Sequence, residues 1–220
     1  MDYVKTLNAN IKKTLSKGRV ALTSPTGCPS IKLYLFDPDV LQGPLSHEEA
    51  QAVVADPAYW SFCWASGQVL ASYILAHPEL VADKIVVDFG CGSGVVAIAS
   101  SISGAKKVYA CDIDRDALDS VAANAEANQV SLIVTDRLDN ISDKIDLITA
   151  ADVLYDKENY PLLDYFTQQS KKTLIADSRV KALPSQHYDM LSTLEARTWP
   201  DLNEFEEFNQ VNLYISKNEQ

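Results

Sequence analysis

The stretch VVDFGCGSGVVAIASSISGAKKVYACDID, residues 86–114, places three glycines within five positions directly after a short apolar run. We expect a strand at residues 84–90 and a helix of small residues at 93–105 that stops at Gly104. A turn this tight between a strand and a helix needs backbone conformations that glycine adopts readily. Because a bare backbone also lets a ligand approach closely, we interpret this glycine loop as a binding turn rather than a packing device alone.

The spacing within the glycine loop indicates which ligand it binds. Gly90, Gly92 and Gly94 follow the pattern G-x-G-x-G, whereas dinucleotide-binding loops follow G-x-G-x-x-G. Asp88 stands two residues before the first glycine, where it would repel a pyrophosphate but suit a positive or amino-bearing ligand. No Gly-Lys-Ser/Thr follows the loop, which excludes a Walker A site.

A second carboxylate follows the next expected strand, residues 106–114. An acid in this position can accept both hydroxyls of a ribose. Asp112 is the first choice for this role and Asp114 the second, because Asp114 can instead cap the following helix. The expected ligand therefore has a ribose, a positive or amino-bearing head and no essential phosphate, and S-adenosylmethionine meets these conditions.

Segments typical of strands and helices alternate from residue 59 onward. We expect strands at 84–90, 106–114, 130–136, 144–155, 171–178 and 212–217, and helices at 65–81, 93–105, 115–129, 159–170 and 186–194. Before residue 59 we expect a helix ending near Gly18, a strand at 30–36 and a short helix opened by Ser46. This alternation predicts an α/β fold with a mostly parallel sheet, helices on both faces and ligands beyond the carboxyl ends of the strands.

Composition and charge narrow the range of partners. The chain has 220 residues, of which 47% are hydrophobic and 22% charged, an ordinary globular balance. No apolar run approaches the roughly 20 residues of a membrane span, and we expect no secretory signal. The formal net charge of −11 disfavours nucleic acid as a partner. The four cysteines lack metal-ligand spacing, so we expect no metal site and buried thiols in a reducing, cytoplasmic compartment.

The glycine loop and ACDID resemble the first motif and the second-strand acid of the class I S-adenosylmethionine-dependent methyltransferases. The resemblance covers roughly residues 59–215. It implies a Rossmann-like, seven-strand sheet and an enzyme whose cofactor contacts include Asp88, the three loop glycines, Asp112 and Ile113. We expect residues 1–58 to form an N-terminal extension packed on a methyltransferase domain at 59–220, in one globular domain overall.

Two further stretches resemble one group within this class, the electron-transfer-flavoprotein β-subunit lysine methyltransferases and their bacterial relatives. YWSFCWASGQVLASYIL, residues 59–75, is similar to their Trp-x-x-Gly helix entry, and ADVLYD, residues 151–156, to their Asp-x-x-Tyr motif. The resemblance implies that Trp64 and Gly67 contact the cofactor. From the residues alone, Trp64 is equally a core aromatic, and Gly67 a site of close helix packing.

The resemblance also implies that Asp152 and Tyr155 line the acceptor site. Asp152 follows the apolar IDLITAA and should emerge at the ligand-bearing edge of the sheet. Asp136 ends the third expected strand, where it could reach an adenine amino group or serve as a turn residue. The chain lacks the Asn-Pro-Pro-Tyr of amide and adenine methyltransferases, and Asp152 departs from the Asn of ribosomal protein L11 methyltransferases.

Together these features favour N-methylation of a protein amine, either a lysine side chain or an N-terminus. In this interpretation Asp152 orients the amine or accepts its proton through water, while Tyr155 forms a wall of the site. One alternative is a small-molecule N-methyltransferase of the nicotinamide type. Another is a non-catalytic cofactor-binding subunit, against which the intact Asp88, glycines and Asp112 argue.

Overall fold

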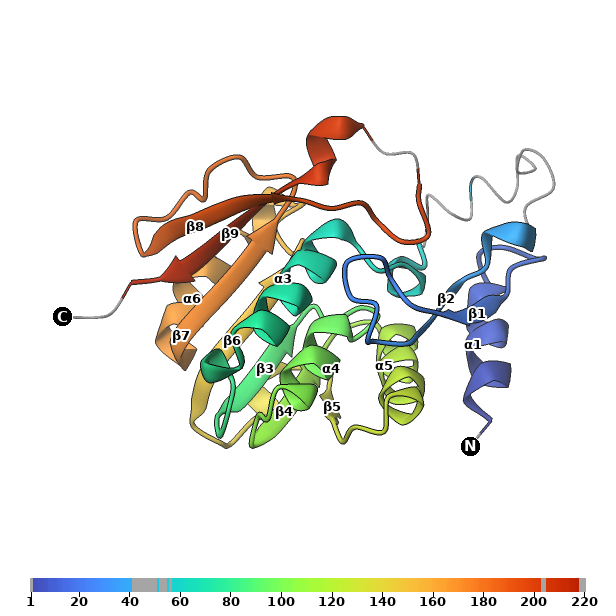
Figure 1. Cartoon of the computed structure of the whole chain (residues 1–220), viewed down its shortest axis with the longest axis horizontal. Helices are drawn as coiled ribbons and strands as arrows, with labels where there is room; N and C mark the ends of the chain where they lie inside the picture. The colour runs from blue at the N-terminus through green and yellow to red at the C-terminus, as the bar shows by residue number, and fades with distance from the viewer. Residues whose placement is uncertain (1, 41–50, 52–54, 56, 203–204, 218–220) are drawn as a thin grey trace.

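The computed structural model describes residues 2–40, 51, 55, 57–202 and 205–217 (Figure 1). Its centre is a seven-stranded sheet in the order β5-β4-β3-β6-β7-β9-β8. The strands are β3 (Ile85–Phe89), β4 (Lys107–Cys111), β5 (Ile133–Thr135), β6 (Ile145–Ala151), β7 (Ser170–Asp177), β8 (Tyr188–Glu195) and β9 (Gln210–Ser216). The first five are parallel, and β9 runs antiparallel to both of its neighbours.

Helices cover both faces of this sheet, as expected from the alternating pattern. The α-helices of the sheet domain are α3 (Ala65–Ala76), α4 (Val95–Ile102), α5 (Arg115–Ala127) and α6 (Leu162–Gln169). The first three lie over one face and α6 over the other (Figure 1). Leu70 and Ile98 are fully buried between the sheet and the first group, and Phe166 is fully buried beneath α6. The predicted α/β class with a seven-strand, mostly parallel sheet is confirmed.

The N-terminal segment forms a helix and a small sheet of its own. Helix α1 (Tyr3–Ile11) ends well before Gly18, and β1 (Val20–Thr23) pairs antiparallel with β2 (Leu33–Phe36). Helix α1 packs beside α5, where Leu7 and Ile11 are buried (Figure 1). The sequence analysis did not foresee β1, and the helix expected at Ser46 lies outside the described residues. No helix in the described part of the chain is long and apolar enough to cross a membrane.

The helix expected at residues 186–194 is wrong, because this segment is the edge strand β8. It pairs antiparallel with β9 from Tyr188↔Ser216 to Glu195↔Gln210. A register shift between Met190 and Ser192 interrupts the pairing, so the two-residue alternation typical of a strand is lost. Apolar residues then recur at intervals of three, which resembles a helix until the pairing with β9 is seen.

Candidate active site

The glycine loop joins β3 to α4 through three left-handed residues. The φ angles are 66° at Gly90, 49° at Gly92 and 77° at Gly94. A Cβ at Gly90 would lie 2.7 Å from Cγ1 of Val153, and one at Gly94 would lie 3.1 Å from Cγ2 of Val121. A Cβ at Gly92 would meet no atom within 4 Å. Gly90 and Gly94 therefore also serve packing, whereas Gly92 presents bare main chain to open space, as a ligand-binding turn requires.

Asp88 lies beneath the glycine loop near the end of β3 and is only 2% exposed. Its Oδ2 accepts a hydrogen bond from the Ala97 amide at 3.0 Å, and its Oδ1 accepts one from the Thr149 hydroxyl at 3.1 Å. Burial raises the pKa of Asp88 to about 7, with these two bonds opposing the rise and the charge of Asp112 adding to it. Both oxygens have protein partners, so Asp88 joins the first turn of α4 to β6, and its contact with a cofactor stays a prediction.

Asp112 and Asp114, the two candidates for the ribose acid, have different tasks in the structure. Oδ2 of Asp112 accepts the Gly92 amide at 2.9 Å, and Oδ1 accepts the Asp114 amide at 3.0 Å. Oδ1 of Asp114 accepts the Asp116 amide at 2.8 Å and caps α5. Partial burial raises the pKa of Asp112, opposed by its backbone bonds. Asp112 therefore lies against the glycine loop, and the adjacent Ile113 is 92% exposed.

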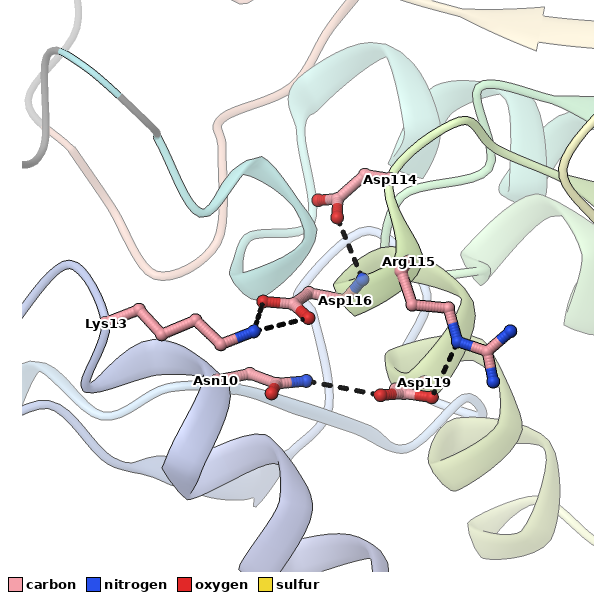
Figure 2. A network of polar contacts seen from close by, with 6 residues as sticks. All are labelled: Asn10, Lys13, Asp114, Arg115, Asp116 and Asp119. Carbon is pink, nitrogen blue, oxygen red and sulfur yellow. Dashed lines mark hydrogen bonds and ion pairs between the residues drawn. The ribbon is translucent and has the colours of Figure 1, made fainter.

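A network of polar and charged residues joins α1 and the segment just after it to the first turns of α5 (Figure 2). Nζ of Lys13 contacts both carboxylate oxygens of Asp116, at 2.7 and 2.8 Å. Asn10 donates to Asp119 at 3.4 Å, and Nε of Arg115 lies 3.7 Å from the same carboxylate. Sequence analysis missed this network, since Lys13 and Asp116 are 103 residues apart. The acidic spacing in DIDRDALD was the available signal, but it does not name a partner.

Asp152 is held at the carboxyl edge of the sheet, directly after β6. Its Oδ1 accepts bonds from the Ser66 hydroxyl at 2.7 Å, the Ser178 amide at 3.0 Å and the Ser178 hydroxyl at 2.9 Å. Burial raises the pKa of Asp152, and these bonds oppose the rise. Its φ of 51° is left-handed, a strained conformation that often accompanies functional positions. The structure thus places Asp152 at the edge where the sequence predicts it.

Aromatic rings connect the start of α3 to the loop after β6. The ring centroids of Tyr59 and Tyr155 lie 6.1 Å apart, and those of Tyr59 and Trp64 lie 5.7 Å apart. Trp64 is partly buried and donates from Nε1 to the Tyr59 carbonyl at 3.0 Å. Partial burial, followed by Tyr59 and Asp112, raises the pKa of Tyr155. The ring of Tyr155 therefore lies beside that of Tyr59, and Tyr59 is a neighbour of the candidate site residues that sequence analysis did not single out.

The two remaining candidates occupy different surroundings. A Cβ at Gly67 would lie 3.2 Å from Cγ1 of Val95, so this glycine allows α3 to pack closely on α4. Asp136 is exposed after β5, where its Oδ1 accepts a bond from Asn140 at 2.9 Å. Cys111 pairs with Phe89 of β3 and with Thr135 of β5, so Asp88, Asp112 and Asp136 share one edge of the sheet. Burial and then the charges of these acids raise the pKa of Cys111 to about 12. Direct cofactor contacts of Gly67 and Asp136 stay predictions.

Metal-binding clusters of three or more His, Cys, Asp or Glu are absent from the residues that the structure describes. The four cysteines, Cys28, Cys63, Cys91 and Cys111, are buried free thiols. The site is therefore built from main chain, carboxylates, hydroxyls and aromatic rings.

Comparisons with known proteins agree with this architecture. The family model described as ribosomal protein L11 methyltransferase (PrmA) matches residues 73–156. The L11 methylase of Lactobacillus delbrueckii subsp. bulgaricus has a similar structure, with TM-score 0.53, 22% identity, and coverage of 70% of this chain and 79% of that one. Magnesium protoporphyrin IX methyltransferase of Synechocystis PCC 6803 with bound S-adenosylmethionine gives TM-score 0.52 and 13% identity over 81% and 87%. The departure expected at Asp152 does not prevent the L11 model from matching.

The fold, the matching family model and the curated relatives together place the chain in the class of the seven-strand, Rossmann-like S-adenosylmethionine-dependent methyltransferases. Two curated relatives, from Homo sapiens and Mus musculus, are both named electron transfer flavoprotein beta subunit lysine methyltransferase. They are 32% and 31% identical over 76% and 78% of this chain, which covers 62% and 69% of their lengths. The chain belongs to the family of electron transfer flavoprotein β-subunit lysine methyltransferases. It spans about three fifths of the length of the human relative.

Proposed function

We propose that this chain transfers a methyl group from S-adenosylmethionine to a lysine amine of a protein. The observation that carries the proposal is that Asp152 follows β6, the parallel neighbour of β3, while the glycine loop after β3 packs against Val153 and bonds to Asp112. The names of the relatives and of the matching family model make the electron transfer flavoprotein β subunit the first candidate substrate and ribosomal protein L11 the second. Both are proteins, which favours a protein acceptor over a metabolite.

The residues of the site fit the cofactor. The open main chain at Gly92 would receive it, and Asp112 would hold the ribose hydroxyls. Ile113 offers an exposed apolar side chain for one face of the adenine, and Asp136 a carboxylate for its amino group. Trp64 and Gly67 would border the same space from the start of α3. When bound, S-adenosylmethionine supplies an electrophilic methyl group on a sulfonium.

The tasks left to the protein are alignment of the amine and removal of its proton. Because the thioether is a good leaving group, most of the rate enhancement comes from holding the amine and the methyl group in line. Asp152, fixed by Ser66 and Ser178, is suited to orient the ammonium and to take its proton directly or through one water. Tyr155 and Tyr59 present exposed rings beside it, at 63% and 49% exposure, which favours contact with a cationic side chain.

The remaining expectations are also proposals. Residues 1–58 act as an extension on the methyltransferase domain at 59–220, which the packing of α1 on α5 supports. The four buried free thiols suit the expected cytoplasmic compartment. The strongly acidic chain is expected to attract basic protein substrates rather than nucleic acid.

Transfer of labelled methyl groups tests the proposal directly. Purified protein is incubated with labelled S-adenosylmethionine and either a cell lysate or purified electron transfer flavoprotein, and the products are resolved by mass. We expect label in a protein lysine. Label in small molecules alone would contradict the proposed acceptor, and heat of binding with a nicotinamide or flavin coenzyme but none with S-adenosylmethionine would contradict the class of cofactor.

Two variants of Asp152 sharpen this test. Asp152→Ala should reduce turnover at least tenfold while calorimetry shows unchanged cofactor affinity, because the acceptor site alone is altered. Asp152→Asn keeps an oxygen for Ser66 and Ser178 and tolerates the left-handed backbone, so it separates orientation of the amine from acceptance of its proton. Wild-type turnover in Asp152→Ala would remove Asp152 from the acceptor site.

A further inference from the structure

Asp177, the last residue of β7, is an acid beside the acceptor site that the sequence analysis did not single out. Strands β6 and β7 are parallel, and Ala151 is paired with Ala176. Asp152 and Asp177, the next residue in each segment, therefore lie side by side at the two strand ends. The Asp152 amide donates to the Ala176 carbonyl at 3.0 Å, which keeps the two strand ends together. Two acids therefore occupy neighbouring backbone positions at the ligand-bearing edge.

Asp177 organises the turn that holds Asp152. Its Oδ1 accepts the amides of Arg179 at 2.8 Å and Val180 at 2.7 Å. Ser178 stands between Asp177 and Arg179, and its amide and hydroxyl both donate to Asp152. One oxygen of Asp177 thus shapes a three-residue turn, and that turn supplies two of the three bonds described for Oδ1 of Asp152.

The other oxygen of Asp177 has no such task. The residue is 0% exposed, and Oδ2 is the one buried side-chain oxygen or nitrogen without a well-formed hydrogen bond among the described residues, although the Leu154 backbone is near enough to lower the pKa of Asp177. A buried carboxylate oxygen without a donor destabilises the folded state. An asparagine here would keep the bonds to the turn without a buried charge, so the charge itself calls for a functional explanation.

We infer that Asp177 is a positioning residue of the acceptor site, which holds Asp152 through the turn at 178–180 and adds a second negative charge that retains the acceptor ammonium. The inference rests on the proposed function of Asp152. Because Oδ2 of Asp177 is inaccessible, Asp177 does not touch the amine and acts through Asp152.

The carboxyl group of Asp177 changes its charge at a pH close to neutral. Burial, followed by the charge of Asp152, raises the pKa of Asp177 to about 6. The other groups that act here are Arg179, which lowers the pKa of Asp152 and stacks on Phe208 at 4.1 Å, and Tyr214 of β9, whose own pKa is raised by burial and then by Asp177. Asp177 is therefore charged at neutral pH and largely protonated near pH 5.

Asp177→Asn removes this titration and keeps the oxygen that shapes the turn. The ratio of kcat/KM for a protein substrate, wild type over Asp177→Asn, should be about tenfold above pH 7 and fall toward one near pH 5, as expected for a charge acting through the protein. Comparing variants at each pH cancels other groups, such as Asp88, that titrate in both proteins. Cofactor affinity should be unchanged, and Asp189→Asn on the exposed side of β8 is the control. A ratio that does not vary with pH overturns the inference.

A measurement without substrate separates this inference from the proposed function. The unfolding midpoints of wild type, Asp177→Asn, Asp152→Asn and the double variant are compared from pH 4 to 8. An acid whose folded pKa is raised stabilises fully at low pH and loses that contribution as pH rises through about 6, so Asp177→Asn should lack this loss. When Asp152→Asn is present, the loss of stability caused by Asp177 should be smaller, because the charges of Asp152 and Asp177 are coupled.

The outcomes are distinct. Coupling in the stability data, with methylation of no protein, leaves the paired acids supported and removes the proposed function. Identical pH dependence with and without Asp152 shows that the acids act independently and overturns the inference, whatever the protein methylates.

Discussion

The hydroxyl of Ser66 donates a hydrogen bond of 2.7 Å to Oδ1 of Asp152, and this bond joins the first turn of α3 to the end of β6. Ser66 is fully buried, so the bond is protected from water. Trp64 lies just before Ser66, and Tyr155 lies just after Asp152. The bond therefore brings together the two stretches whose resemblance to amine methyltransferases implies cofactor and acceptor contacts.

Replacement of Ser66 by alanine tests this connection. Ser66→Ala should reduce turnover about tenfold and leave cofactor affinity within about twofold, because Asp152 keeps only its bonds from Ser178. Stability should fall by about 1–2 kcal/mol, the usual consequence of removing a buried hydrogen bond. Ser72→Ala, which removes a bond to the Gly27 carbonyl from the same helix, is the control and should keep wild-type turnover. Equal turnover in the two variants would contradict the role of Ser66.

Alanine substitutions at Gly90 and Gly92 should differ in their consequences: Gly90→Ala should lower stability more, and Gly92→Ala should weaken cofactor binding more. Gly90→Ala places a Cβ 2.7 Å from Val153 and should destabilise the fold by about 1–3 kcal/mol. Gly92→Ala meets no atom within 4 Å, so only the left-handed backbone conformation costs stability, about 1 kcal/mol.

The same Cβ at Gly92 enters the space proposed for the cofactor. Calorimetry should therefore show at least tenfold weaker binding of S-adenosylmethionine to Gly92→Ala, while urea unfolding shows the larger stability loss in Gly90→Ala. Undiminished cofactor affinity in Gly92→Ala would mean that the ligand does not approach the main chain at this turn.

The elements predicted well from the sequence are those that local patterns determine. The run from 84 to 105 was readable as strand, turn and helix because its apolar residues, glycines and Gly104 are adjacent in the chain. The φ of 88° at Gly104 agrees with the expected end of α4. The choice between Asp112 and Asp114 stayed open, since both follow the same strand and only the three-dimensional bonds distinguish a loop acid from a helix cap.

The elements that were missed depend on distant pairing. Strand β8 has a bulge and an exposed edge, so its sequence lacks the alternation by which strands are recognised. The sequence of strand β1, VALT, does not alternate between apolar and polar residues. Ser66 meets Asp152 across 86 residues, and no local signal marks such a pair. Asp177 did carry a signal, because it ends an apolar strand just as Asp152 does.

Stability should depend on pH through Asp88. Burial raises the pKa of Asp88 to about 7, far above the value near 4 of an unfolded aspartate. The contribution of Asp88 to stability is therefore complete below about pH 4 and is lost as pH rises through about 7, by up to about 4 kcal/mol. Urea unfolding of Asp88→Asn from pH 4 to 8 should show a smaller loss than that of the wild type, with the contribution of Asp177 through about pH 6 remaining.

Asp146 provides a control of opposite sign. Bonds from the Ile85 amide and then Lys171 lower the pKa of Asp146. Its contribution to stability is therefore present above about pH 4 and is lost as pH falls below that value. Asp146→Asn should flatten the acid side of the stability curve and leave the loss toward pH 7 intact. A loss toward pH 7 that is as large in Asp88→Asn as in the wild type would show that Asp88 does not contribute to it.

The ion pair between Lys13 and Asp116 should influence cofactor affinity from outside the site. The Asp116 amide donates to Asp114, as Figure 2 shows, and the Asp114 amide donates to Asp112. The segment just after α1 is therefore linked through consecutive contacts to the acid proposed to hold the ribose. Lys13→Met should weaken cofactor binding two- to fivefold at low salt, because an exposed ion pair contributes about 0–1 kcal/mol. Salt near 1 M should abolish the difference by screening the pair. Lys12→Met, at the exposed end of α1, is the control, and equal affinities of the two variants at low salt would disprove the link.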